Sequence, residues 1–292
     1  MVTEQLIWMI FILPLISFLI CSLIIRQLFN NRSIFAGYTA ILLIGFSFLI
    51  SILAFYEVII NHKQISTSSI EWLTIGQFSL SIGLLLDPLT IVMLTVVTGV
   101  SLMVQVYSLG YMKSESQDSN HSEDPAELGQ PVLARYFSYM SLFTASMLGL
   151  ILASNIIQLF IFWELVGLCS YLLIGFWFHK PAAANAAKKA FLVTRLGDFG
   201  FLLGIMYLFS HQHLFPSDSN PLDIITINTY VPLLVNTGLI SLTAITLISL
   251  GIFFGAMGKS GQFPLHTWLP DAMEGPTPVS ALIHAATMVA AG

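Results

Sequence analysis

Long apolar segments, separated by short polar ones, make up most of the chain. A bilayer core about 30 Å thick needs about 20 apolar residues per helix. By that criterion the chain contains seven spans, near residues 6–28, 34–60, 83–110, 136–153, 156–178, 187–210 and 236–258. A further helix begins near residue 276 and runs to Gly292. The pattern therefore predicts an all-α, polytopic transmembrane helix bundle with about eight spans, the seventh of them broken near Lys259.

Two polar segments interrupt this series of spans. Residues 65–82, QISTSSIEWLTIGQFSLS, mix Thr, Ser, Ile and Trp at alternating spacing, which favours a short hairpin outside the membrane. Residues 114–131, SESQDSNHSEDPAELGQP, are polar and acidic and contain turn formers, so we expect a mobile cytoplasmic loop. These features divide the chain into a two-span region with the start of the hairpin, residues 1–79, and a membrane domain, residues 80–292.

The basic residues predict the orientation in the membrane, because cytoplasmic loops collect Lys and Arg. With the N-terminus outside, the even-numbered loops hold only Lys63. The odd-numbered loops are then cytoplasmic and hold Arg26, Arg32, Lys113, Arg135, Lys180, Lys188 and Lys189. The first basic residues also follow the first apolar segment instead of preceding it, so we expect a retained span and not a removable signal peptide.

Composition agrees with a membrane protein and narrows the function classes. Of 292 residues, 56% are hydrophobic and 9% are charged, more apolar side chain than a soluble domain of this size could bury. No basic patch for nucleic acid is present. The only cysteines, Cys21 and Cys169, lie in apolar segments and are expected to be small core residues, with no metal site. Without a CxxC pair, a haem or flavin fingerprint or a Walker A loop, we expect the chain itself to carry no electrons and hydrolyse no nucleotide.

An acidic residue stands near the middle of the predicted fifth span. It is Glu164, in the segment IFWELVGLCSYLLIGFW. An ionised residue at that depth costs roughly 2.5–3.5 kcal/mol, so such residues normally face a bundle interior and function there. Burial in a poorly polar site favours the neutral form of a carboxyl group, which suits it to bind and release a proton. The alternative is a structural acid that is hydrogen-bonded across helices.

The predicted sixth span carries charges from its cytoplasmic end into the membrane, in KKAFLVTRLGDFGF. Arg195 and Asp198 are three residues apart and therefore neighbours on one helical face, where each lowers the cost of burying the other. The pair is either structural or sets the charge state of a neighbouring site. Lys188 and Lys189 either belong to this functional series of charges or simply anchor the helix at the level of the lipid head groups.

The segment GAMGKSGQFPLHTWLP, residues 255–270, predicts the break in the seventh helix. Pro264 cannot donate a backbone hydrogen bond, and Gly258 and Gly261 remove side chains around it. A broken membrane helix leaves unpaired carbonyl groups, which are tolerated only in a protein interior or beside water. Lys259 lies at the break, where desolvation favours its neutral form. Lys259 and Glu164 would then pass protons through intervening water; the alternative is a lysine whose amine reaches the membrane surface.

The sequence predicts roles for two further residues. His284 lies about two turns into the helix that begins near residue 276, and a histidine is suited to proton relay, although a single buried histidine is often only a satisfied polar residue. Asp87, in LLLDPLT, is expected to cap the start of the third helix.

Taken together, IFWELVGLCSYLLIGFW, KKAFLVTRLGDFG, YMSLFTASMLGLILASN and the segment from GKSGQFPLHTWLP to Gly292 resemble the antiporter-like subunit 5 (chain L) of proton-pumping NADH:quinone oxidoreductase, respiratory complex I. The resemblance runs from about residue 80 to 292, and the family is related to the large subunits of Mrp-type Na+/H+ antiporters. It implies a proton half-channel formed by broken helices. The family's essential glutamate matches Glu164, its broken-helix lysine Lys259, its sixth-span aspartate Asp198, the arginine one turn earlier Arg195, and its eighth-span histidine His284.

The resemblance implies a setting as well. Family members run to roughly twice this length, so we expect an N-terminal fragment with the first half of the proton-translocating domain. Partners would be other membrane-arm subunits in the lipid bilayer, while NADH, FMN, Fe–S clusters and quinone are expected in other subunits. The membrane would be a bacterial inner membrane, or else a thylakoid membrane. The alternatives are a Mrp-type antiporter or membrane-bound hydrogenase subunit, or a non-conducting structural subunit of the membrane arm.

Overall fold

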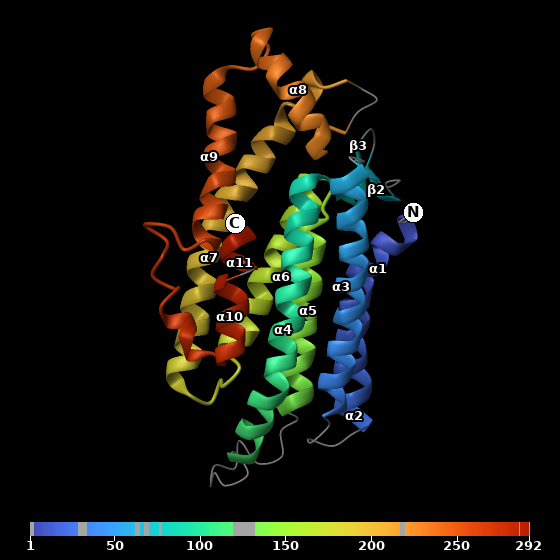
Figure 1. Cartoon of the computed structure of the whole chain (residues 1–292). Helices are drawn as coiled ribbons and strands as arrows, with labels where there is room; N and C mark the ends of the chain where they lie inside the picture. Colours follow the sequence, from blue (N-terminus) through green and yellow to red (C-terminus); the bar gives the residue numbers. More distant parts are fainter. Residues whose placement is uncertain are drawn as a thin grey trace.

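The computed structural model describes residues 3–28, 34–61, 65–66, 70–75, 78–118, 132–216, 220–285 and 287–291. These residues form a bundle of long helices with two small β-sheets at the end where the N-terminus lies (Figure 1). Helices α2, α4 and α6 end, and α3, α5 and α7 begin, at the opposite end of the bundle (Figure 1).

Helices account for most of the described chain. The α-helices are α1 (Glu4–Leu19), α2 (Arg26–Leu28), α3 (Phe35–Asn61), α4 (Pro88–Asp118), α5 (Val132–Ile151), α6 (Ile156–Ile174), α7 (Pro181–Ser210), α8 (Ile224–Asn236), α9 (Leu242–Lys259), α10 (Thr277–Ala285) and α11 (Met288–Ala291). A π-helical segment (Ile20–Ile25) joins α1 to α2, and short 3₁₀ helices occur at Gln212–Leu214 and Asp271–Glu274. The prediction of an all-α membrane bundle is confirmed.

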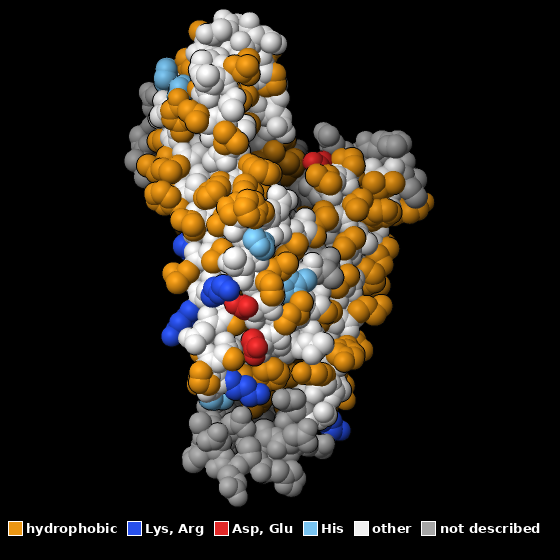
Figure 2. Space-filling model, turned by 90° about the vertical axis from the view of Figure 1, so that its left-hand side faces the viewer, with side chains coloured by type: hydrophobic (Ala, Val, Ile, Leu, Met, Phe, Trp, Pro, Cys, Tyr) orange, Lys and Arg blue, Asp and Glu red, His pale blue; other side chains and the backbone are white. Residues whose placement is uncertain are grey.

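Six helical segments of the described chain are long and apolar enough to cross a membrane. They are Glu4–Ile25, Phe35–Ile59, Pro88–Ser114, Ile156–Ile174, Pro181–Ser210 and Leu242–Lys259. Arg26 lies in α2, Lys113 near the end of α4 and Lys180 directly before α7, so these basic residues share one end of the bundle; the orientation in the membrane stays a prediction. Figure 2 shows hydrophobic side chains over much of one face, with most of its Lys and Arg side chains in the lower half.

Helix α5 is the centre of the bundle and is buried almost all round. Sixteen of its 20 residues are buried, and it packs against α1, α4 and α6. Its polar side chains find partners across helices: the Tyr136 hydroxyl lies 2.9 Å from the Ser108 hydroxyl, and Ser141 Oγ lies 2.9 Å from Ser17 Oγ. A helix with no outward face belongs to the core of a larger bundle, which is why its polar groups are hydrogen-bonded inside the protein.

The polar segment between α3 and α4 forms the predicted hairpin. Strand β2 (Ile70–Ile75) pairs antiparallel with β3 (Phe78–Ile82), and β1 (Ile65–Ser66) pairs with β4 (Leu85–Leu86). The Gly83 amide donates to Gln158 Oε1 at 3.2 Å, which joins this segment to the start of α6.

Two details differ from the expectation. Helix α4 continues to Asp118, so residues 114–118 of the predicted polar loop are helical, because Met, Lys, Glu and Gln near its end support a helix. The remaining loop residues, 119–131, lie outside the described residues. The helix α8 was not predicted, because its 13 residues are apolar but too few to span a membrane.

Glycines bring α7 and α9 into close contact. A Cβ atom built on Gly251 would lie 2.8 Å from the Gly200 carbonyl oxygen, and one on Gly197 would lie 3.1 Å from the Gly258 Cα. Small residues at a membrane-helix interface let the backbones approach closely, which gives van der Waals packing where no hydrophobic effect operates between helices. This contact fixes α9, and with it Lys259, against α7.

Replacement of Gly251 by alanine tests this packing. The new methyl group would meet backbone atoms, so we expect Gly251→Ala to destabilise the α7–α9 contact by about 1–3 kcal/mol. Gly110→Ala is the matched control, since nothing lies within 4 Å of a Cβ at that position in α4. The measurement is thermal unfolding of the detergent-solubilised protein. Equal unfolding temperatures for the two variants would contradict the proposed close contact.

Candidate functional site

Two ion pairs lie side by side where α6, α7 and α9 meet. They consist of Glu164 from α6, Arg195 and Asp198 from α7, and Lys259 from the last position of α9. Four of the five residues that the family resemblance matched are therefore brought together by helices that pack on one another.

The inner pair is fully buried. Lys259 Nζ lies 3.3 Å from Asp198 Oδ2, and each side chain is only 2% exposed. The indole N–H of Trp163 donates to the other carboxylate oxygen, Asp198 Oδ1, at 2.6 Å. Lys259 Nζ also lies 5.7 Å from the centroid of the Trp163 ring. The hydrogen bond and the opposite charge offset the free-energy cost of removing the carboxylate and the ammonium group from water. Either charge buried alone would bear that cost in full.

The outer pair lies at the edge of the bundle. Arg195 Nη1 contacts Glu164 Oε2, and these side chains are 42% and 21% exposed. The Arg195 guanidinium carbon also lies 4.7 Å from the centroid of the Phe191 ring, one turn earlier on α7. The outer pair is thus only partly covered by the described part of this chain.

The expected pairing of Arg195 with Asp198 is wrong, because each of these two residues forms its ion pair with a residue of another helix. Residues three apart on an α-helix differ by about 60° in direction, enough for Arg195 to reach outward to α6 while Asp198 points inward to α9. The alternation of acid and base along the cluster leaves its formal charge at zero. Each cation therefore has one acidic partner, and Arg195 and Asp198 remain neighbours on α7.

A glycine gives Lys259 access to the helix that carries Glu164. A Cβ atom built on Gly167 would lie 2.6 Å from Lys259 Nζ, so the ammonium group occupies the space that a side chain would take. Gly167 is three residues from Glu164 on α6. The amine therefore reaches the same level of the bundle as the acid, as the sequence predicted for a helix broken at this point.

The break after Lys259 is confirmed. Helix α9 ends there, Gly261 adopts a positive φ of 59°, and turns follow as far as Pro270. The Gly258 carbonyl oxygen, close to the end of α9, accepts a hydrogen bond of 2.9 Å from the indole N–H of Trp268. This fully buried tryptophan supplies the partner that a broken helix in a membrane requires.

His284 belongs to neither of the two ion pairs. It sits on α10, half-buried, with its ring 6.3 Å from that of Trp268 and nearly parallel to it. Neither ring nitrogen has a hydrogen-bond partner among the residues that the structure describes. Trp268 therefore contacts both the end of α9 and His284, a link that the sequence analysis did not find.

Trp163 was not identified from the sequence either. The sequence did contain a signal for it: a tryptophan inside a predicted membrane span, whose indole N–H group needs a hydrogen-bond partner. Other expectations hold: Asp87 Oδ1 accepts from the Thr90 amide at 2.7 Å and so caps α4, and Cys21 and Cys169 are free and buried. Within the described ranges, no group of three or more His, Cys, Asp or Glu residues could hold a metal ion.

The fold and the charges define a class of protein: a multi-span membrane protein with a buried acid–lysine pair at a broken helix. Comparison with known families shows which family of membrane proteins this chain belongs to. A family model described as "NADH:quinone oxidoreductase/Mrp antiporter, TM" matches residues 153–292, and one described as "NADH-Ubiquinone oxidoreductase (complex I), chain 5 N-terminus" matches residues 72–120. The chain belongs to this family of antiporter-like membrane subunits.

Individual relatives agree with that assignment. The chain is 46% identical to the chloroplastic NAD(P)H-quinone oxidoreductase subunit 5 of Chlorokybus atmophyticus, over 98% of this chain and 42% of that protein. It is 42% identical to NAD(P)H-quinone oxidoreductase chain 5 of a Synechocystis strain, over 99% of this chain and 39% of that protein. The chain thus spans about two fifths of the length of these relatives.

Solved structures show the same fold. A chain of the Mrp complex from Dietzia sp. matches 98% of this chain and 27% of its own length, with a TM-score of 0.71 and 28% identity. A chain of an archaeal membrane-bound sulfane sulfur reductase matches 98% of this chain and 51% of its own, with a TM-score of 0.75 at 21% identity. At this identity, the similarity to the sulfane sulfur reductase chain shows a shared fold and nothing about function.

Removing one member of the inner pair tests the interdependence of its charges. Asp198→Asn leaves the Lys259 ammonium group buried without its acidic partner, so we expect a loss of about 3–5 kcal/mol of stability. The double variant Asp198→Asn/Lys259→Met removes both charges and should recover most of that loss. Unfolding in detergent measures both.

The exposed pair of Lys189 and Asp271 is the matched control. Lys189 Nζ lies 2.7 Å from Asp271 Oδ2, with the side chains 45% and 42% exposed. Asp271→Asn should cost less than about 1 kcal/mol, because water already screens this pair. An Asp198→Asn variant no less stable than Asp271→Asn, or a double variant no better than Asp198→Asn, would show that the inner charges do not depend on each other.

Proposed function

We propose that this chain is part of a proton-translocating membrane-arm subunit of a NAD(P)H:quinone oxidoreductase, in which electron transfer elsewhere in the complex drives proton movement. The observation that carries the proposal is the buried Asp198–Lys259 pair beside the Glu164–Arg195 pair, at the end of a broken helix. Buried ionisable groups inside a membrane are costly, and they typically line proton paths.

The geometry supports a step in which the ion pairs exchange partners. When the Lys259 ammonium group gives up its proton, Asp198 loses its cationic partner. Arg195, one turn away on α7, is then the nearest described cation of the cluster that can move toward Asp198. Glu164 in turn loses its partner and takes up a proton, so one proton has moved from Lys259 to Glu164 and the formal charge of the cluster is unchanged. Glu164 then releases its proton away from Lys259 and pairs with Arg195 again, and Lys259 takes up a new proton from another donor, so both ion pairs are restored and one proton has been passed on.

An exchange of ion-pair partners can supply the free energy that moving a proton across the membrane requires. Moving one charge against 100 mV takes about 2.3 kcal/mol, a factor of about 50 in an equilibrium constant. Breaking a buried ion pair changes free energy by a comparable or larger amount. Quinone reduction in another subunit would supply the bias. We propose that the electron carriers NADH, FMN, Fe–S clusters and quinone bind to other subunits, and that neighbouring membrane-arm subunits are the partners of this chain.

His284 is proposed to continue the path beyond Lys259. Its ring nitrogens are unpaired within the described chain, and Trp268 lies between it and the end of α9. A buried imidazole without a protein partner can take up or release a proton through ordered water, since water is the remaining partner that can satisfy it.

The second candidate function is a large subunit of a Mrp-type Na+/H+ antiporter. The 28% identity to a chain of the Mrp complex and the shared family model favour keeping it. The relatives at 42–46% identity carry the name NAD(P)H-quinone oxidoreductase, which supports the first candidate. Their chloroplast and cyanobacterial sources support a thylakoid membrane, with a bacterial inner membrane as the alternative. Dependence of transport on sodium ions would distinguish the antiporter.

Neutralising the acid and the lysine tests the proposal. We expect Glu164→Gln and Lys259→Met, each in the assembled complex, to reduce proton pumping by about tenfold or more, because the partner exchange needs both groups to titrate. Pumping is measured in proteoliposomes with a pH-sensitive dye, and electron transfer is measured alongside with an artificial acceptor.

Lys189→Gln is the matched control, since Lys189 is paired with the exposed Asp271 outside the cluster and should leave pumping unchanged. Normal pumping by Glu164→Gln and Lys259→Met complexes would refute proton translocation through this chain and leave a structural role.

A further inference from the structure

Helix α4 carries a stripe of four polar side chains in the interior of the bundle. They are Thr98, Ser101, Gln105 and Ser108, which follow one another at intervals of three and four residues and therefore lie on one face of the helix. Each side chain is at most 1% exposed. None of them belongs to either ion pair. The stripe is thus a polar region of the bundle that is separate from the four charges.

The two ends of this stripe contact neighbouring helices. At one end, Thr98 Oγ1 lies 2.9 Å from Ser51 Oγ of α3. At the other end, Ser108 Oγ lies 2.9 Å from the Tyr136 hydroxyl of α5. Helices α3, α4 and α5 pack on one another. The middle of the stripe lies between these two contacts and therefore faces the junction of the three helices.

The two middle side chains lack such partners. Neither Ser101 Oγ nor Gln105 Oε1 has a hydrogen-bond partner among the residues that the structure describes, although both atoms are buried. Ser108, by contrast, also bonds within its own helix, because its hydroxyl donates to the Val104 carbonyl oxygen at 2.7 Å. An unpaired polar group inside a membrane protein costs free energy, because no bulk water is present to satisfy it. Ser101 and Gln105 therefore require a partner.

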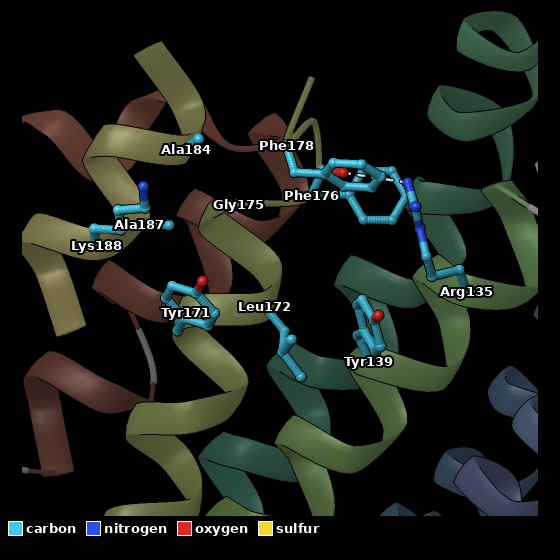
Figure 3. A pocket seen from close by; sticks show the side chains of 10 residues that line it. All are labelled: Arg135, Tyr139, Tyr171, Leu172, Gly175, Phe176, Phe178, Ala184, Ala187 and Lys188. Atoms are coloured by element: carbon cyan, nitrogen blue, oxygen red, sulfur yellow. Dashed lines mark hydrogen bonds between the residues drawn. The ribbon is translucent and has the colours of Figure 1, made fainter. Parts of the chain in front are cut away.

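The cavity of about 190 Å³ between the ends of α5, α6 and α7 differs from this stripe (Figure 3). Its buried cation, Arg135, already has partners in the wall of the cavity. The Arg135 guanidinium carbon lies 4.5 Å from the centroid of the Phe176 ring, and Nη2 donates to the Phe176 carbonyl oxygen at 3.2 Å. The unpaired groups on α4 are the stronger indication of a bound ligand.

One water molecule can serve both side chains. Residues four apart on a helix have Cβ atoms about 5–6 Å apart, and a single water can bridge polar groups at such positions. The water would accept a hydrogen bond from the Ser101 hydroxyl and donate one to Gln105 Oε1. The α3 side is not tightly packed at this level, since a Cβ atom built on Gly45 would have Leu102 Cδ1, 3.9 Å away, as its nearest neighbour.

Other ligands fit the stripe less well. All four of its side chains are neutral, so a buried cation would lack the acidic partner that offsets its removal from water. An apolar ligand would leave both the Ser101 hydroxyl and the Gln105 amide oxygen unpaired. Buried waters, in contrast, typically bind to polar groups that have no other partner.

We propose that the junction of α3, α4 and α5 holds an ordered water molecule, bound between Ser101 Oγ and Gln105 Oε1. The water fills the gap in the stripe between the Thr98–Ser51 contact and the Ser108–Tyr136 contact. The inference is independent of the proposed proton path, because it concerns hydration of the bundle and uses none of the residues of the ion pairs.

The test is an electron cryo-microscopy map of the intact complex that contains this chain, at a resolution that shows single waters. We expect density for one water within about 2.5–3.0 Å of both Ser101 Oγ and Gln105 Oε1. Gln105→Met replaces the acceptor by an apolar side chain of similar length, so the density should be lost in that complex.

Thr95→Val is the matched control. It also removes a polar group from α4, but Thr95 is not part of the stripe, and its hydroxyl donates to the Ile91 carbonyl oxygen at 2.9 Å. The density should be unchanged in this variant.

Three results would overturn the proposal. The first is a map of the unmodified complex without density between the two side chains, or with Ser101 and Gln105 bonded directly to each other. The second is density that persists in Gln105→Met. The third is density that is present in sodium buffer and absent in choline buffer, which would indicate a cation site instead.

Discussion

The buried ion pair between Asp198 and Lys259 determines how α7 and α9 pack around the charged site. Two charges that are 2% exposed remain ionised in a membrane bundle only if they stay together, so α7 and α9 must be held in contact. The glycines between those helices allow that contact, Gly167 leaves room for the ammonium group, and Trp163 satisfies the second carboxylate oxygen. The break after Lys259 places its amine in this position, and Trp268 compensates the break.

The outer pair differs from the inner one in a way that matters for function. Glu164 and Arg195 are partly exposed at the edge of the bundle, so exchange of their partners costs less than exchange within the core. The cluster therefore joins a strongly held pair to a weakly held one through two neighbouring positions of α7. In such an arrangement, a change in the charge of the inner pair leads to a change in the protonation of Glu164 in the outer pair. Coupling between subunits would require a link of this kind.

Much of this could be predicted from the sequence. Apolar segment lengths gave the long helices, and Pro264 with its flanking glycines gave the broken helix, because both depend on local properties of the chain. Charges inside apolar segments identified Glu164, Asp198 and Lys259 as candidates, and the place of His284 in the last apolar helix identified it as a candidate for proton relay. The polar hairpin was also predicted from its alternating pattern.

The partners of these charges could not be predicted. Spacing along one helix suggested that Arg195 pairs with Asp198, but a difference of about 60° in direction is enough to send the two side chains to different helices. Which neighbour each one meets depends on how α6, α7 and α9 pack, and that is a property of the whole bundle. The roles of Trp163, Gly167 and Trp268 were missed for the same reason, since each is defined by a contact between elements.

The most direct test of the central claim is the protonation state of Glu164 during turnover. Infrared difference spectra of the complex, recorded between its resting and quinone-reducing states, report the appearance of a protonated carboxyl group. The partner exchange predicts such a band in the unmodified complex and its loss in Glu164→Gln. A spectrum without the band, or one in which Glu164→Gln leaves it unchanged, would contradict the account.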